Sequence, residues 1–123
     1  MLNTSFSKQQ IEGEKMKKIL QVNFEVTSDK SEREKVRKTL GATTPSYGPN
    51  GDVKGLLWKI WIANEAKGYA GGIYLFKDEG SVEAYLKGEL IASLRKTPGV
   101  SNFEAKVFDI VPEPTKISRG PVD

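Results

Sequence analysis

The segment from Gly55 to Phe76, GLLWKIWIANEAKGYAGGIYLF, constrains the fold of this chain more than any other. Residues 56–64 and 71–77 are rich in aromatic and β-branched side chains, which favour strands. A short polar connection at residues 65–69 separates the two runs, as in a β-hairpin. The chain therefore contains an antiparallel pair of strands, and the flanking segments must pack with it.

The segments on either side of this hairpin complete a recognisable pattern. Residues 19–27 and 102–111 alternate between apolar and polar side chains, which predicts two more strands. A capping box at Asp29 opens a helix that we expect to end at Gly41. Residues 78–96 carry apolar side chains at steps of three and four, which predicts a second helix. The order βαββαβ predicts an α+β, ferredoxin-like fold with a four-stranded antiparallel sheet and both helices on one face.

The chain has 123 residues, which is the size of one ordinary domain. We expect a flexible N-terminal tail at residues 1–18, with Met16 as an alternative natural start, and the ferredoxin-like domain at residues 19–111. Residues 112–123 contain three prolines and predict a C-terminal tail or arm. The 41–54 loop is rich in proline and glycine, and its length is typical of loops with a function, such as a lid.

Composition excludes several classes of chemistry. The chain has no cysteine and no histidine, so disulfides, thiolate metal sites, Ser-His-Asp triads and histidine-ligated haem are excluded. Residues 1–18 hold a net charge of +2, which leaves +3 minus 2, or +1, for the rest, so we expect no nucleic-acid partner. We expect no metal, because the carboxylates lack the ligand spacing of a calcium loop. We also expect no membrane partner, because no apolar run approaches the ~20 residues that span a bilayer. The N-terminus shows no secretory signal, which predicts a cytoplasmic protein.

One face of the predicted sheet has no helix to cover it. The first strand presents three polar side chains there, Gln21, Asn23 and Glu25. Continued alternation would place further side chains on the same open face, namely Lys59, Trp61, Glu104, Lys106 and Phe108. Exposed aromatic side chains mixed with charged ones are typical of a partly hydrated interface, so we predict a homodimer through the open sheet face. A solvated face with two isolated aromatic residues is the alternative.

A family resemblance is carried by residues 55–86, from GLLWKIW to EAYL, and by the later segment AKVFDIV. The chain resembles the YdhR-like monooxygenase family over roughly residues 18–115. The resemblance implies a dimeric α+β barrel, in which two ferredoxin-like sheets pack face to face. The wider superfamily is similar to the antibiotic-biosynthesis monooxygenases, which oxidise polycyclic aromatic compounds without metal, flavin or haem. A branch that degrades haem uses a histidine ligand, which this chain lacks.

The resemblance implies a cofactor-independent monooxygenase that acts on a small aromatic or quinol-like compound in a pocket between sheet and helices. Such chemistry needs aromatic walls and hydrogen-bond donors beside the substrate anion. Our candidate catalytic residues are therefore Trp58, Tyr74 and Tyr85. Our candidate substrate-binding residues are Trp61, Tyr47 and Asn23. For Trp58 and Tyr85 a packing role is the alternative.

Two other functions remain open at this point. The chain has no acid–base pair at fixed spacing, which favours a non-catalytic homodimer that binds a small ligand in the same pocket. The third reading, isomerisation or decarboxylation of a lactone-like compound, rests on analogy of fold alone.

Overall fold

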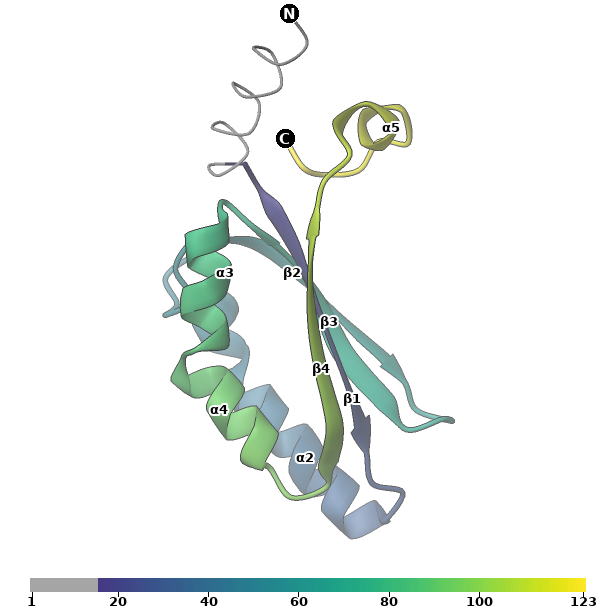
Figure 1. Cartoon of the computed structure of the whole chain (residues 1–123). Coiled ribbons are helices and arrows are strands. Elements are labelled where there is room, and N and C mark those ends of the chain that lie inside the picture. The colour runs from purple at the N-terminus through teal and green to yellow at the C-terminus, as the bar shows by residue number, and fades with distance from the viewer. Residues whose placement is uncertain (1–15) are drawn as a thin grey trace, which may run out of the picture.

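The fold is a single antiparallel sheet with helices on one face (Figure 1). The computed structural model describes residues 16–123, so the N-terminal tail predicted at residues 1–18 lies largely outside the described residues. The sheet has the order β2-β3-β1-β4. Its strands are β1 (Lys18–Val26), β2 (Leu56–Asn64), β3 (Tyr69–Phe76) and β4 (Val100–Asp109). This order is that of a ferredoxin-like α+β domain, as predicted.

The helices form a second layer against this sheet (Figure 1). Helix α2 (Lys30–Thr43) continues into the 3-10 helix η1 (Thr44–Tyr47), and α3 (Glu79–Leu86) is followed by α4 (Glu89–Lys96). A short helix, α5 (Pro112–Ile117), follows β4 within the predicted C-terminal tail or arm. No helix among residues 16–123 is long and apolar enough to cross a membrane.

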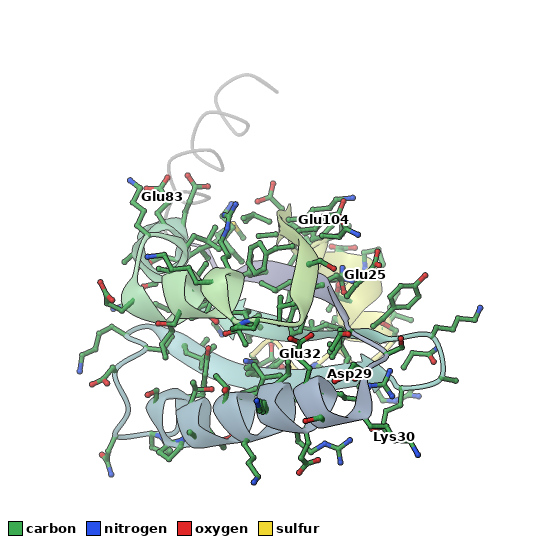
Figure 2. All side chains as sticks on the ribbon, turned by 90° about the horizontal axis from the view of Figure 1, so that it is seen from below. Glu25, Asp29, Lys30, Glu32, Glu83 and Glu104 are labelled. Carbon is green, nitrogen blue, oxygen red and sulfur yellow. The ribbon has the colours of Figure 1, made fainter. Side chains whose placement is uncertain are left out.

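Helix α2 begins as predicted but ends later than predicted. The Asp29 carboxylate accepts a hydrogen bond from the backbone N–H of Glu32 at 2.8 Å, and both residues lie at the start of the helix (Figure 2). The expected end at Gly41 is wrong, because the helix runs on to Thr43 and then tightens into η1. A glycine inside a helix costs only about 1 kcal/mol relative to alanine, so the helix continues through Gly41. Part of the predicted 41–54 loop is therefore helical, and it carries Tyr47.

The single helix predicted at residues 78–96 is in fact two helices. Gly88 is extended, with ψ of 177°, and serves as the N-cap of α4. The apolar spacing continues through this break, because both helices bury their apolar residues against the same sheet face, with Val82 and Tyr85 from α3 and Ile91 from α4. The break lets the chain bend over the sheet.

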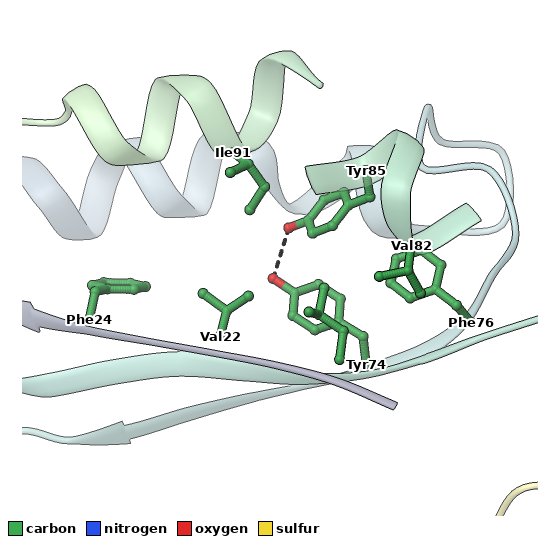
Figure 3. Packing of buried hydrophobic residues seen from close by; sticks show 8 residues of the cluster. Val22, Phe24, Tyr74, Phe76, Val82, Tyr85 and Ile91 are labelled. Atoms are coloured by element: carbon green, nitrogen blue, oxygen red, sulfur yellow. Dashed lines mark hydrogen bonds between the residues drawn. The ribbon is translucent and has the colours of Figure 1, made fainter. Parts of the chain in front are cut away.

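The hydrophobic core lies between the sheet and the helices. Leu20, Val22 and Phe24 of β1 face this side, and β3 adds Tyr74 and Phe76. Val82, Tyr85 and Ile91 close it from the helix layer (Figure 3). Full burial of one such side chain contributes about 1.5–3 kcal/mol, so this cluster accounts for most of the packing between the two layers.

The other sheet face is partly exposed and mixes apolar side chains with polar ones, which include Gln21, Asn23, Glu104 and Lys106. Strand pairing places Ile60 opposite Ile73, and Ile19 opposite Phe108, on the face away from the helices. Ile60 is 50% exposed and Phe108 is 46% exposed. Leu75, which pairs with Ile19 and Trp58 on the same face, is fully buried. Exposed apolar side chains among polar ones are typical of a partly hydrated protein interface.

Candidate functional site

An irregularity in β2 decides which of its side chains face the helices. The pairing with β3 shifts at Leu57, so that Leu56 pairs with Phe76 but Trp58 pairs with Leu75. Beyond this β-bulge, Lys59 pairs with buried Tyr74. Because paired residues share a sheet face, Lys59 and Trp61 face the helices. Our prediction that these two residues lie on the open face is therefore wrong.

A cavity of about 240 Å³ lies on this helix side of the sheet, at the β2–β3 edge. Its sheet wall includes Phe24, Lys59, Trp61, Ala70 and Tyr74. Its helix wall comes from α2, η1 and α4, and it includes Leu40, Thr43, Tyr47, Leu90, Leu94 and Thr97. The cavity is therefore mostly apolar and aromatic, as small-molecule sites commonly are.

Lys59 is held among three aromatic rings in this cavity. Its Nζ lies 3.3 Å from the ring centroid of Trp61, 3.8 Å from that of Tyr47 and 4.7 Å from that of Tyr74. Burial lowers the pKa of Lys59 from 10.5 to about 7, since a charged amine loses hydration there. The aromatic faces act in the opposite direction because they attract a cation. Near neutral pH this amine can therefore exist in both protonation states.

Gly72 makes room for the lysine. It lies in β3 opposite Trp61, and a Cβ atom at this position would stand 2.8 Å from Cε of Lys59 and 3.1 Å from Cε1 of Tyr74. Any larger residue would push the lysine side chain away from the aromatic rings. The neighbouring Gly71 meets the backbone of β1, where a Cβ would lie 1.9 Å from the carbonyl oxygen of Val22. This Gly-Gly pair therefore allows close approach of the β1 backbone on one side and of the Lys59 side chain on the other.

Three tyrosines form a hydrogen-bonded group beside the lysine. The Tyr85 hydroxyl lies 2.8 Å from the Tyr74 hydroxyl and 2.8 Å from the Tyr47 hydroxyl. Tyr85 comes from α3 and Tyr74 from β3, and their hydroxyls point toward each other (Figure 3). Burial raises the pKa of all three tyrosines, so each stays protonated at neutral pH.

Counting protons shows what this group offers a ligand. Three hydroxyls carry three protons, and the two hydrogen bonds between them use two. One proton therefore remains, and it lies on Tyr47 or Tyr74 whenever Tyr85 donates one of the two bonds rather than accepting both. Both end residues line the cavity, whereas Tyr85 lies behind them. The group can donate one hydrogen bond to a bound molecule without ionising.

Of the six predicted site residues, the structure brings four together. Tyr47, Trp61, Tyr74 and Tyr85 surround Lys59 or contact its neighbours.

The other two predicted residues lie on the opposite sheet face. Trp58 pairs with Leu75 there, and its indole N–H donates to the carbonyl of Pro121 at 2.7 Å. Asn23 pairs with Gly71 on the same face, as the alternation of the first strand predicted. Our expectation that Trp58 lies beside the cavity is wrong, because the bulge at Leu57 turns its side chain away.

Sequence reasoning missed Lys59 as a site residue. A lysine between Trp58 and Trp61 in a strand-forming run is an unusual choice, and that is the signal we overlooked. No group of three or more acidic, histidine or cysteine side chains arranged to hold a metal occurs within residues 16–123. The chemistry of the cavity therefore centres on one amine and several hydroxyls.

The sequence of residues 19–121 matches the family described as "Putative mono-oxygenase ydhR". The chain belongs to the YdhR family. The match spans every strand of this YdhR protein except the first residue of β1, and it includes Lys59 and the tyrosine group. Among curated proteins, no sequence matches this chain.

Solved structures share the fold of this YdhR protein at low sequence identity. A protein of unknown function from Nitrosomonas europaea is 18% identical, with a TM-score of 0.63 over 80% of this chain and 93% of that one. A "putative antibiotic biosynthesis monooxygenase" from Caulobacter crescentus is 13% identical, with a TM-score of 0.58 over 85% and 98% of the two chains. A variant of SnoaB, a cofactor-independent oxygenase from Streptomyces nogalater, is 16% identical, with a TM-score of 0.53 over 79% and 98%. These likenesses establish the ferredoxin-like fold.

Proposed function

We propose that this YdhR protein is a cofactor-independent monooxygenase that oxidises a small aromatic or quinol-like compound in the cavity beside Lys59. The observation that carries the proposal is the position of the Lys59 amine, which lies inside an aromatic cavity and has a pKa of about 7. A general base works best when its pKa lies near the working pH.

Lys59 would activate the substrate by removing a proton. In its neutral form the amine takes the proton of a bound phenol, which leaves a phenolate beside the new ammonium group. The phenolate transfers electrons to O₂ and forms a carbon–oxygen bond, and the ammonium returns its proton to give a ring hydroperoxide. Loss of the ring C–H proton to the amine then cleaves the O–O bond, and the hydroxide that leaves takes this proton from the ammonium to form water. The products are a quinone and one molecule of water, so that phenol plus O₂ is balanced.

The surrounding groups would hold the phenolate during this reaction. The spare proton of the tyrosine group can be donated to the phenolate oxygen from Tyr47 or Tyr74. Trp61 and Tyr47 lie edge to face, with ring centroids 5.2 Å apart, and they would form walls against the substrate ring. Donors fixed before reaction stabilise a developing anion without reorganising.

The proposal also includes a homodimer through the open sheet face. Ile60, Phe108 and Tyr69 project from that face and are each about half exposed. Burial of this apolar area in a second copy would form the dimeric α+β barrel that the family resemblance implies. Substitution Ile60→Asp places a charge in that interface, so it should dissociate the dimer in light scattering, whereas exposed Lys67→Asp in the hairpin turn should leave it intact.

Oxygen incorporation tests the catalytic proposal. With 1-naphthol as the probe and ¹⁸O₂ present, the protein should release 1,4-naphthoquinone that carries one labelled oxygen, with EDTA having no effect. Lys59→Met should lower the rate about 100-fold or more, as expected for loss of a general base. Product formation that persists without O₂, or that is equal in the variant, would refute the proposal. Tight binding without turnover would instead favour the non-catalytic ligand-binding protein.

A further inference from the structure

We propose that the cavity selects an acidic aromatic ligand, one ring or two fused rings carrying a carboxylate or an ionised hydroxyl, and that Lys59 is its anion-binding residue. This inference uses the same cavity as the proposed function and narrows its substrate class. It rests on charge, on hydrogen-bonding capacity and on size, each of which is set by the residues that line the cavity.

The charge of the cavity is unbalanced. Lys59 is the only lining residue whose side chain is charged in the ordinary range of pH. The ion pairs among residues 16–123 involve Lys18 and Arg37, and none involves Lys59. A cation that is removed from water is normally paired with an anion. Here the described part of the chain supplies no such anion, so the ligand is the natural source.

Hydrogen-bonding capacity leads to the same conclusion. The ammonium group of Lys59 has three N–H donors, and the aromatic faces around it attract its charge without accepting ordinary hydrogen bonds from all three. No hydrogen bond within residues 16–123 uses Lys59 Nζ, and no fully buried side-chain nitrogen or oxygen there lacks a partner. The Nζ atom must therefore be accessible from the cavity. A carboxylate or phenolate oxygen is the acceptor that suits it.

The elements packed around Lys59 offer no competing charge. Tyr47 from η1, Tyr74 from β3 and Tyr85 from α3 are the titratable groups that face it, and all three stay neutral. Helices α2 and α4 contribute only apolar residues and the hydroxyls of serine and threonine to the cavity. Thr43 and Thr97 already donate their hydroxyl protons to carbonyls of their own helices. Among the described residues that line the cavity, only Lys59 can therefore make an ionic contact with a ligand.

The volume limits the ligand to a small aromatic compound. A cavity of about 150 Å³ lined by apolar residues binds benzene in another protein. The present cavity of about 240 Å³ has room for one ring with substituents or for a compact two-ring system. Drug-sized ligands need ~300–1,000 Å³. Trp61, Tyr47 and Phe24 supply the flat walls against which such a ring would pack.

Binding of an anion must be linked to protonation of Lys59. The free amine has a pKa of about 7, so below pH 7 it is already charged and binding needs no proton uptake. Above pH 7 the Lys59 amine must take up a proton when an anionic ligand binds. Its affinity should then fall by up to 10-fold per pH unit, until the pKa of Lys59 in the complex is reached. A neutral ligand of the same shape should show the opposite trend or none.

Salicylate and its neutral analogue salicylamide provide a matched pair of probes. We expect calorimetry without oxygen at pH 6 to give salicylate at least a 10-fold higher affinity than salicylamide, and a fall in salicylate affinity between pH 7 and pH 9. Lys59→Gln should remove the preference and the pH dependence together, with circular dichroism showing an intact fold. Lys67→Gln, at an exposed position in the hairpin turn, should change neither.

The outcomes separate this inference from the proposed function. Equal affinities for the two probes, or equal losses for both in Lys59→Gln, would overturn the inference. Turnover of 1-naphthol together with such equal affinities would leave the monooxygenase proposal intact and refute anion selection alone. Selective salicylate binding in a protein that never consumes O₂ would support anion selection and refute the oxygenase.

Discussion

The charge of Lys59 should make the stability of this protein depend on pH in a window where few other groups titrate. The pKa of Lys59 is 10.5 in its ordinary environment and about 7 in the folded protein. Between these values the unfolded chain binds more protons than the folded one, so the free energy of unfolding rises with pH. Below pH 7 the amine is charged in both states, and the full cost of burying it is present. That cost is relieved as pH rises through 7 and beyond.

The magnitude follows from the two pKa values. Between pH 6 and pH 9 the linkage relation gives a rise of roughly 2.6 kcal/mol for a fully desolvated amine. Lys59 is only partly buried, so screening by solvent reduces this to about 1 kcal/mol. Lys59→Met removes the titrating group and keeps the length of the side chain. The variant should be more stable than the original at pH 6, and the difference should shrink by about 1 kcal/mol at pH 9.

The composition leaves few other groups that could change the stability in this pH range. The chain has no histidine and no cysteine, so besides Lys59 the α-amino group is the main one expected to titrate between pH 6.5 and pH 8.5. Urea unfolding of both proteins at pH 6, 7, 8 and 9, followed by circular dichroism, gives the difference directly. Lys67→Met is the control, because Lys67 is exposed in the hairpin turn, outside both the cavity and the proposed dimer interface. A difference between original and Lys59→Met that stays constant with pH would refute the reasoning.

Three further substitutions test the packing of the site and the anchoring of the C-terminal segment. Gly72→Ala should reduce stability by about 1–2 kcal/mol and weaken salicylate binding, because the new methyl group displaces Lys59. Unchanged urea unfolding together with unchanged calorimetric affinity would contradict this. Tyr85→Phe should cost about 1–3 kcal/mol in urea unfolding, since two hydroxyls lose their shared partner, and a loss below 0.5 kcal/mol would argue against the hydrogen-bonded group. Trp58→Phe removes the donor to Pro121 and should speed hydrogen exchange at residues 112–123, and unchanged exchange would disprove that anchoring role.

The sheet could be predicted from sequence because its signals are local and repeated. The alternation at residues 19–27 lies within one residue of the observed β1, and the limits predicted for β2 agree with the structure. The helix break at Gly88 was missed because its apolar spacing continues through the break. The end of α2 was missed because a single glycine is a weak stop signal when the following residues can still form helical turns.

The site was harder to predict because its orientation depends on one irregular residue. Leu56 and Leu57 are both apolar, so either could face the core, and the alternation that follows fits both choices. A β-bulge within such a run of apolar residues cannot be recognised from the sequence. Four aromatic site residues were still predicted, since large aromatic side chains suit a pocket wall in either orientation. Lys59 could be assigned only once its pairing with Tyr74 was known.

The bulge in β2 links the fold to the proposed chemistry. Without it, Trp58 would pair with Tyr74 and face the helices, while Lys59 would pair with Ile73 on the open face. The cavity would then be filled by an indole and contain no charge, and the Lys59 amine would lie on the face that we assign to the dimer. One extra residue in an edge strand costs only a local break in strand pairing. The same extra residue places the Lys59 amine among aromatic rings, on the face opposite the one that we assign to the dimer.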